Sequence, residues 1–226
     1  MPCSGLRYIV SIFAVACELA TAGSGTQRFA TAEYWNSAYE KGEYGSQYEW
    51  YELAWSDIRP YINSVIPAAG SQSIDVLVSG CGNSPISSDI AADGFARRLV
   101  NVDVSTSVIE HMRKAHPELT WTVSDSRELA EFDDSSFDLV FDKGTLDALR
   151  GSQEEIHSTR LFEAYRRVIR TDGAVVIITS CMEDECLPLL HARFSSVDVV
   201  KVPKKDIEEK KRKAKRAGYK GEIREH

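Results

Sequence analysis

A repeated alternation of short apolar segments and helical segments, which begins at Ile74, constrains this chain more than any other feature of its sequence. The apolar segments are rich in β-branched and aromatic residues, are short enough to be strands, and cover 74–78, 98–102, 119–123, 137–141 and 173–179. The sequence between and after them predicts helices near 84–92, 105–116 and 153–170. Strands that are apolar almost throughout are typical of a parallel sheet with helices on both faces. The predicted fold class is therefore α/β, with a doubly wound, mostly parallel sheet.

The length of 226 residues favours one compact domain with extensions at its ends. We expect that domain over 31–202, a leader or disordered extension over 1–30, and a basic helical tail over 203–226. In the first segment an apolar run precedes Ala20-Thr21-Ala22, which resembles a signal-peptidase site, and a mitochondrial leader is another interpretation. The run is too short to cross a membrane as a helix. We prefer the disordered extension.

Charge is distributed unevenly along the chain. The net charge is −7, yet basic residues gather in the tail, so the rest of the chain is strongly acidic. An acidic surface repels a phosphate backbone, which disfavours nucleic acid as the main partner. A basic protein or a cationic side chain suits this surface better. We therefore expect a protein partner, no nucleic acid and no membrane, and a monomer.

The cysteines argue against a metal site. They are odd in number, widely spaced and without a CxxC pair, and they are Cys3, Cys17, Cys81, Cys181 and Cys186. This pattern predicts reduced thiols and no bound metal. A cytoplasmic location is the matching expectation, with a mitochondrial or a secreted protein as the alternatives.

Polar residues stand at the ends of the predicted strands, where ligands bind in doubly wound sheets. Gly80 and Gly82 supply the first two glycines of a dinucleotide fingerprint, but Pro85 replaces the third. Asp103 follows the next strand, where a carboxylate can accept both hydroxyls of a ribose. Asp125 follows the third strand and could accept from an adenine amino group. These positions together predict an adenosine-containing cofactor.

The missing third glycine disfavours a pyrophosphate and favours S-adenosylmethionine, which has no phosphate. Its amino-acid end could approach the backbone at Gly80 and Gly82, because no Cβ stands there. Its sulfonium charge suits an acidic pocket lined by aromatic rings. Such rings crowd 34–55, where they could cover a ligand or pack on the core.

Three segments resemble the seven-strand methyltransferases that modify lysine in translation elongation factor 1A. They are Tyr48-Glu49-Trp50-Tyr51, Gly80-Cys81-Gly82-Asn83-Ser84 and Lys143-Gly144-Thr145-Leu146-Asp147. The resemblance covers about two-thirds of the chain, from Tyr34 to Ser180. A related branch, the citrate synthase lysine methyltransferases, has tryptophan in place of Leu146. The acidic segment 182–185 is more similar to that branch.

The resemblance implies a role for each matching residue. It makes Trp35, Tyr39 and Trp50 aromatic contacts of the cofactor. The other implied cofactor contacts, together with the two glycines above, are Asp103, Val104, Asp125, Ser126 and Lys143.

The predicted chemistry is methyl transfer to a lysine amine. That amine has an ordinary pKa of about 10.4 and must lose its proton before it can attack a sulfonium methyl group. We expect Asp142, at the end of the fourth strand, to steer and orient the incoming ammonium. Asp147 is expected to serve as a helix cap or loop residue.

The C-terminal part departs from the family pattern. Relatives continue after the fifth strand with a helix and two more strands, but here only 195–202 is a candidate strand. The last hairpin is therefore expected to be shortened or replaced. The leading hypothesis is a lysine methyltransferase acting on elongation factor 1A. Alternatives are a citrate synthase lysine methyltransferase, a small-molecule methyltransferase and a catalytically impaired cofactor-binding relative.

Overall fold

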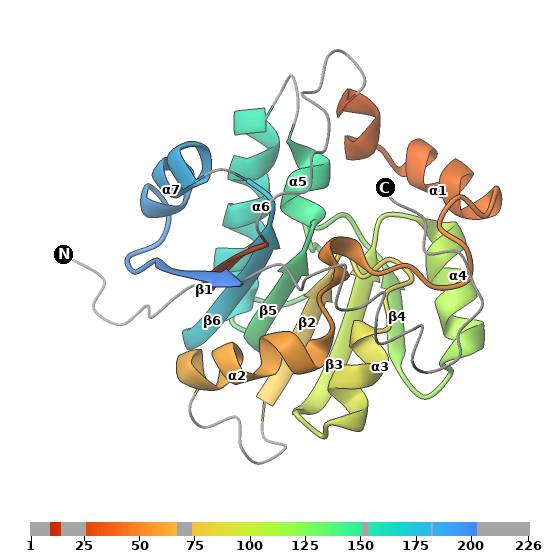
Figure 1. The fold of residues 1–226 in the computed structure, drawn as a ribbon, viewed down its shortest axis with the longest axis horizontal. Helices are drawn as coiled ribbons and strands as arrows, with labels where there is room; N and C mark the ends of the chain where they lie inside the picture. Colours follow the sequence, from red (N-terminus) through yellow and green to blue (C-terminus); the bar gives the residue numbers. More distant parts are fainter. Residues whose placement is uncertain (1–9, 15–25, 67–73, 151–153, 182, 203–226) are drawn as a thin grey trace, which may run out of the picture.

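The computed structural model describes residues 10–14, 26–66, 74–150, 154–181 and 183–202, and all statements below concern these residues (Figure 1). A seven-stranded sheet forms the centre, in the order β4-β3-β2-β5-β6-β1-β7. Its strands are β1 (Val10–Ala14), β2 (Ile74–Ser79), β3 (Ala96–Asp103), β4 (Thr120–Val123), β5 (Phe137–Lys143), β6 (Ile169–Thr179) and β7 (Asp198–Val202). Every pairing between them is parallel. The predicted doubly wound parallel sheet is confirmed.

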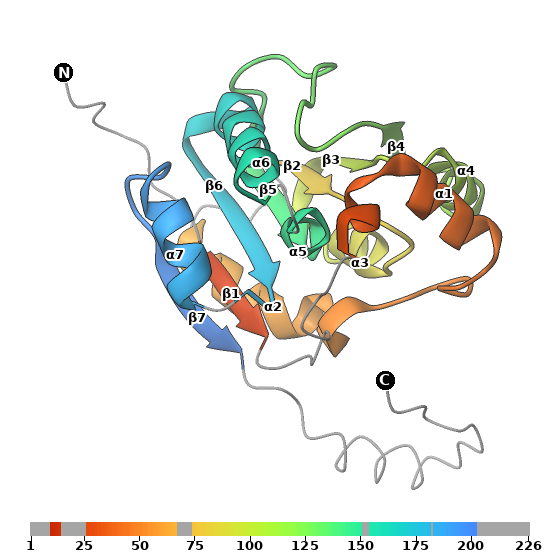
Figure 2. The ribbon, with the colours of Figure 1, turned by 90° about the horizontal axis from the view of Figure 1, so that it is seen from above.

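Helices cover both faces of the sheet. They are α1 (Ala32–Glu40), α2 (Trp55–Val65), α3 (Ile86–Ala92), α4 (Thr106–Ala115), α5 (Thr145–Leu149), α6 (Glu154–Val168) and α7 (Glu183–His191), with short 3-10 helices at Thr26–Ala30 and Trp50–Glu52. Figure 2 shows α6 and α7 on one side of the sheet and α2 and α3 on the other. Successive strand residues point to opposite faces, so Val76 and Val78 join the core under α2 to α4, whereas Leu77 joins the core under α5 to α7.

The N-terminal segment holds a strand, which the sequence analysis did not anticipate. β1 lies between β6 and β7, and Val10 pairs with both Val176 and Asp198. Residues 10–14 are therefore ordered as a strand, in contrast to the disordered extension that we preferred. The reason is that a short run of β-branched and aromatic residues suits an internal strand as well as it suits a signal sequence. Residues 1–9 and 15–25 lie outside the described residues.

The C-terminal edge differs from the family pattern, as expected. β7 coincides with the candidate strand at 195–202, and no antiparallel hairpin follows β6 within the described part of the chain. β1 occupies the position beside β6 instead. The predicted tail, 203–226, lies outside the described residues.

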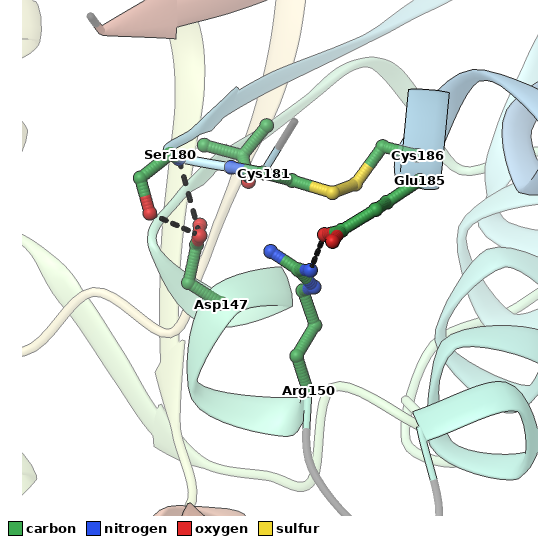
Figure 3. The surroundings of a disulfide bond; sticks show 7 residues. Asp147, Arg150, Ser180, Cys181, Glu185 and Cys186 are labelled. Atoms are coloured by element: carbon green, nitrogen blue, oxygen red, sulfur yellow. Dashed lines mark hydrogen bonds and ion pairs between the residues drawn. A yellow bond between two sulfur atoms is a disulfide. The ribbon is translucent and has the colours of Figure 1, made fainter. Parts of the chain in front are cut away.

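The expectation of reduced thiols is wrong for one pair of cysteines. Cys181, which follows β6, and Cys186, in the first turn of α7, form a disulfide (Figure 3). Their Cα atoms lie 6.1 Å apart, a separation that a disulfide can span. The short connection from strand to helix brings them together, although their spacing matches no familiar cysteine motif. Cys81 is buried and has a free thiol.

None of the described helices is both long enough and apolar enough to cross a membrane. Within the same residues, no three or more His, Cys, Asp or Glu side chains are grouped to hold a metal ion.

Candidate active site

A cavity opens at the carboxyl ends of β2, β3, β4 and β5, which is the place that the sheet topology predicts for a ligand. It has an empty volume of about 1170 Å³, including space open to solvent at its mouth. Every residue predicted to contact the cofactor lines it, namely Trp35, Tyr39, Trp50, Gly80, Gly82, Asp103, Val104, Asp125, Ser126 and Lys143. The structure thus brings these side chains to one place, while their contacts with a cofactor remain predictions.

The turn after β2 depends on two glycines. Gly80 and Gly82 have φ values of +59° and +52°, in the left-handed region that disfavours other residues. A Cβ on Gly80 would stand 1.9 Å from the Thr145 hydroxyl, and one on Gly82 would stand 2.8 Å from the Tyr39 hydroxyl. The sequence analysis attributed both glycines to the approach of a ligand. The structure adds a second reason, the close packing of Thr145 and Tyr39.

Asp103 supports this turn from the end of β3. Its carboxylate accepts hydrogen bonds from the backbone N–H of Gly82 and of Ser105, each at 2.9 Å. Burial raises the pKa of Asp103, and the backbone donors oppose that rise. A carboxylate has about four acceptor sites, and the backbone N–H groups of Gly82, Val104 and Ser105 act on three of them. The side chain also lines the cavity, so Asp103 can still accept from a ribose hydroxyl.

A residue that the sequence analysis missed, Arg127, occupies the cavity end near β4. Its guanidinium donates to both oxygens of Asp125, at 2.6 to 3.0 Å, and lies 3.1 Å from Nδ1 of His157. Burial opposes ionisation of Asp125, but the hydrogen bonds from Arg127 outweigh it and lower the pKa of that carboxyl. The Asp125 carboxylate thus already accepts hydrogen bonds from Arg127, and an adenine amino group would have to donate to the same carboxylate. The two-residue spacing of an acid and an arginine was the available signal.

Lys143 lies in a buried polar cluster with two further residues that the sequence analysis did not select. Its ammonium forms an ion pair with Glu49 and donates to Ser84 at 3.4 Å, and Ser84 donates to Glu49 at 2.7 Å. Burial lowers the pKa of Lys143 to about 7. Since Ser84 closely follows the glycine turn, this cation can face the carboxylate of an amino-acid ligand.

The aromatic segment covers the cavity. Trp35 lies 6.0 Å from Tyr39 and 5.7 Å from Tyr44 between ring centroids, and Tyr44 lies 5.7 Å from Trp50. Trp35 donates its indole N–H to the Phe29 carbonyl at 2.7 Å. These rings are only partly buried, whereas Trp55 is buried in the core. The core interpretation therefore holds for Trp55, while the contact of the other rings with a ligand stays a prediction.

Asp142 does not reach the cavity. It is fully buried, and its two oxygens accept from the Thr145 N–H and from the Tyr165 hydroxyl, each at 2.9 Å. Its neighbours Phe141 and Lys143 line the cavity, and the alternation of side chains along β5 turns Asp142 to the opposite face. The Asp142 side chain therefore faces α6 and is turned away from the cavity, where it was expected to contact the incoming ammonium.

Asp147, expected to be a cap or loop residue, does line the cavity. Its Oδ1 accepts from the backbone N–H and the hydroxyl of Ser180, at 3.1 and 2.7 Å, which ties α5 to the end of β6 (Figure 3). The loop role is therefore present, but it uses only one oxygen. Nearby, burial and the Asp147 carboxylate raise the pKa of Tyr51.

The donor and acceptor set fits an adenosine carrying an amino-acid group. A carboxylate with spare lone pairs, an open glycine turn, a buried cation and a cover of aromatic rings line one cavity. The sequence predicted that these residues bind such a ligand, and all of them line the same cavity, which supports the prediction.

Comparisons with known proteins identify the family of this chain. A family model described as "Methyltransferase domain" matches residues 77–177, from β2 to β6. The eEF1A lysine and N-terminal methyltransferase of Danio rerio is 31% identical over 162 residues, which cover 70% of this chain and 22% of that protein. EEF1A lysine methyltransferase 4 of Bos taurus is 32% identical over 171 residues, covering 67% of this chain and 62% of that protein. The chain therefore spans about a fifth of the length of the first relative.

Among solved structures, a TehB-like SAM-dependent methyltransferase from Corynebacterium glutamicum aligns with a TM-score of 0.48 and 18% identity. The alignment covers 74% of this chain and 81% of that chain.

Proposed function

We propose that this chain, a class I S-adenosylmethionine-dependent methyltransferase that resembles the lysine methyltransferases of elongation factor 1A, methylates a lysine side chain of a protein substrate, namely elongation factor 1A. The single observation that carries the proposal is the cavity at the strand ends, which gathers Asp103, the glycine turn and the aromatic cover inside the matched methyltransferase domain. The names of the relatives support the choice of substrate.

Each part of the cavity has a task in this reaction. S-adenosylmethionine, when bound, supplies a sulfonium methyl group, which a neutral amine takes up as the electrons of the broken C–S bond return to sulfur. Asp103 would hold the ribose, and Lys143 the carboxylate at the amino-acid end. Trp35 and Trp50 exclude water, which favours an uncharged amine over an ammonium. Holding the reacting atoms close together supplies much of the rate enhancement.

A labelling assay tests the proposal. The protein is incubated with S-adenosylmethionine labelled in its methyl group and with unmethylated recombinant elongation factor 1A, citrate synthase, or a small-molecule extract. We expect label on elongation factor 1A, at a lysine located by mass spectrometry, and none with Asp103→Ala. Label on an α-amine would move the proposal to N-terminal methylation. Label on citrate synthase or small molecules alone would contradict it.

We further propose that the protein acts in the cytoplasm, where elongation factor 1A works, and acts as a monomer. The disulfide weighs against the location, because such bonds persist mainly in oxidising compartments. Trapping free thiols with iodoacetamide at the moment of lysis, followed by mass spectrometry, tests this point. Unmodified Cys181 and Cys186 in the native protein would contradict a cytoplasmic location.

A further inference from the structure

We infer that Asp147 forms the binding site for the positively charged amine of the methyl acceptor. This inference rests on the proposed amine methylation and identifies the side chain that would select an amine. It replaces Asp142 in that role.

The order of the strands gives the cavity a direction. Asp125, Asp103 and Gly80 follow β4, β3 and β2, which are neighbours in the sheet, and these three positions suit adenine, ribose and the amino-acid end in turn. The next strand along is β5, and α5 begins two residues after it with Thr145. An acceptor that approaches the methyl group without crossing the adenosine therefore enters beside α5, where Asp147 lines the cavity.

One oxygen of the Asp147 carboxylate lacks a hydrogen-bond donor. Oδ1 takes two hydrogen bonds from Ser180, and the Tyr51 hydroxyl interacts with the same carboxylate, but Oδ2 is buried and accepts no hydrogen bond within the described part of the chain. An ionised oxygen that is shielded from water and lacks a donor is unfavourable. A donor supplied by a ligand would remove this disadvantage, and an ammonium supplies the strongest hydrogen bond of this type.

The surroundings of Asp147 suit the rest of a lysine side chain. The Tyr51 ring stands on one side, with its hydroxyl 3.3 Å from the position of a Cβ on Gly144. Leu149, Ala148 and Phe29 add apolar surface to the same cavity. A chain of methylene groups can pack on such surfaces while its amine reaches the carboxylate.

The two cationic side chains near Asp147 form ion pairs with other residues. Arg150, one turn along the chain, forms an ion pair with Glu185 (Figure 3), and Lys143 pairs with Glu49. Asp142 faces α6 and does not line the cavity. A cation that enters the cavity therefore meets a carboxylate that no cationic side chain in the described residues neutralises by an ion pair.

The test uses two analogues of S-adenosylhomocysteine in which nitrogen replaces sulfur. One analogue carries a 3-aminopropyl arm on that nitrogen and the other carries a butyl arm of the same length. Calorimetry measures both against the wild type and against Asp147→Asn, whose amide oxygen can still accept from Ser180. We expect the wild type to bind the aminopropyl analogue about tenfold more tightly, and Asp147→Asn to show no preference. Affinity for plain S-adenosylhomocysteine should change by less than about twofold.

Asp184→Asn is the matched control, because it removes an exposed negative charge of α7 that does not line the cavity, and it should keep the preference. A preference that survives in Asp147→Asn, or is absent from the wild type, would overturn the inference. Loss of S-adenosylhomocysteine binding by Asp147→Asn would also overturn it and give Asp147 a structural role only. The binding preference does not depend on turnover, so failure to methylate any protein would contradict the proposed function separately.

Discussion

Asp142 shows how much one buried carboxylate can depend on its surroundings. It lies at one end of a hydrogen-bonded series in which Tyr165 joins Asp142 to Ser79, and Ser79 donates to Ser126 at the cavity wall. Burial raises the pKa of Asp142 to about 7. The folded protein therefore holds this proton at pH values where the unfolded chain has lost it.

That difference predicts a pH-dependent stability. An unfolded aspartate titrates near 3.9, so between about pH 4 and pH 7 only the folded state carries the proton, and the free energy of unfolding falls as the pH rises. Between these two pH values the free energy of unfolding should fall by about 1.4 kcal/mol per pH unit. Below pH 4 the stabilisation from this proton no longer changes with pH. Asp142→Asn should lack this slope, since its amide can donate to Tyr165 and accept from Thr145. Urea denaturation at several pH values measures the free energy of unfolding of each protein. The same pH dependence in the wild type and in Asp142→Asn would refute the assignment.

Asp103 carries the second prediction at this scale. Asp103→Asn should lower the affinity for S-adenosylhomocysteine by about tenfold or more, because an amide offers one acceptor atom where a ribose and two backbone N–H groups need two. Calorimetry measures the affinity. Asp89→Asn, at an exposed site on α3, is the control and should bind normally. Equal affinities would remove Asp103 from the cofactor site.

At the scale of elements, the disulfide fastens α7 to the end of β6. A cross-link over so short a loop should add about 2 kcal/mol to the free energy of unfolding. For a chain of this length, reduction should then lower the melting temperature by about 4 to 8 °C. Cys186→Ser should melt at that lower temperature with or without reductant, as differential scanning fluorimetry can show. A wild type that is insensitive to reductant would contradict the prediction.

The positions of the strand ends were predictable from the sequence. The direction in which the side chains at these ends point was harder to predict. Asp103 and Asp125 were identified because any residue at the end of a parallel strand comes near the ligand edge. The choice between Asp142 and Asp147 depended on which face of β5 holds the Asp142 side chain, and on the turn at Gly144, with φ of +86°, which places Asp147 on α5. Arg127, Glu49 and the packing of Thr145 on Gly80 depend on contacts across the fold that no local pattern encodes.

The stability of the whole molecule should depend on its first described strand, β1. Because β1 separates β6 from β7, deletion of residues 1–14 should expose the edge of β6 and leave β7 without a partner. We expect this truncated protein to aggregate or to melt at least about 5 °C lower, since unpaired edges associate readily. Deletion of residues 1–9 is the matched control, because pairing starts at Val10. Size-exclusion chromatography and thermal melting provide the readouts, and normal behaviour of the longer deletion would contradict the sheet order.

The same strand lies outside the range 31–202 that the sequence predicted for the domain, yet it belongs to the sheet. The alternation of strands and helices predicted a sheet starting at Ile74, and that pattern identified β2 to β6. β1 stands outside the alternation, so its partners could not be inferred from its neighbours in the sequence.

The position of β1 also affects the order of folding during synthesis. The ribosome makes this strand before the other described strands, but Val10 pairs with Val176 and Asp198, more than 160 residues later in the sequence. Pairs so distant in sequence raise the contact order and slow folding. Throughout elongation an apolar segment must therefore wait without a partner, which makes the nascent chain a natural client for chaperones.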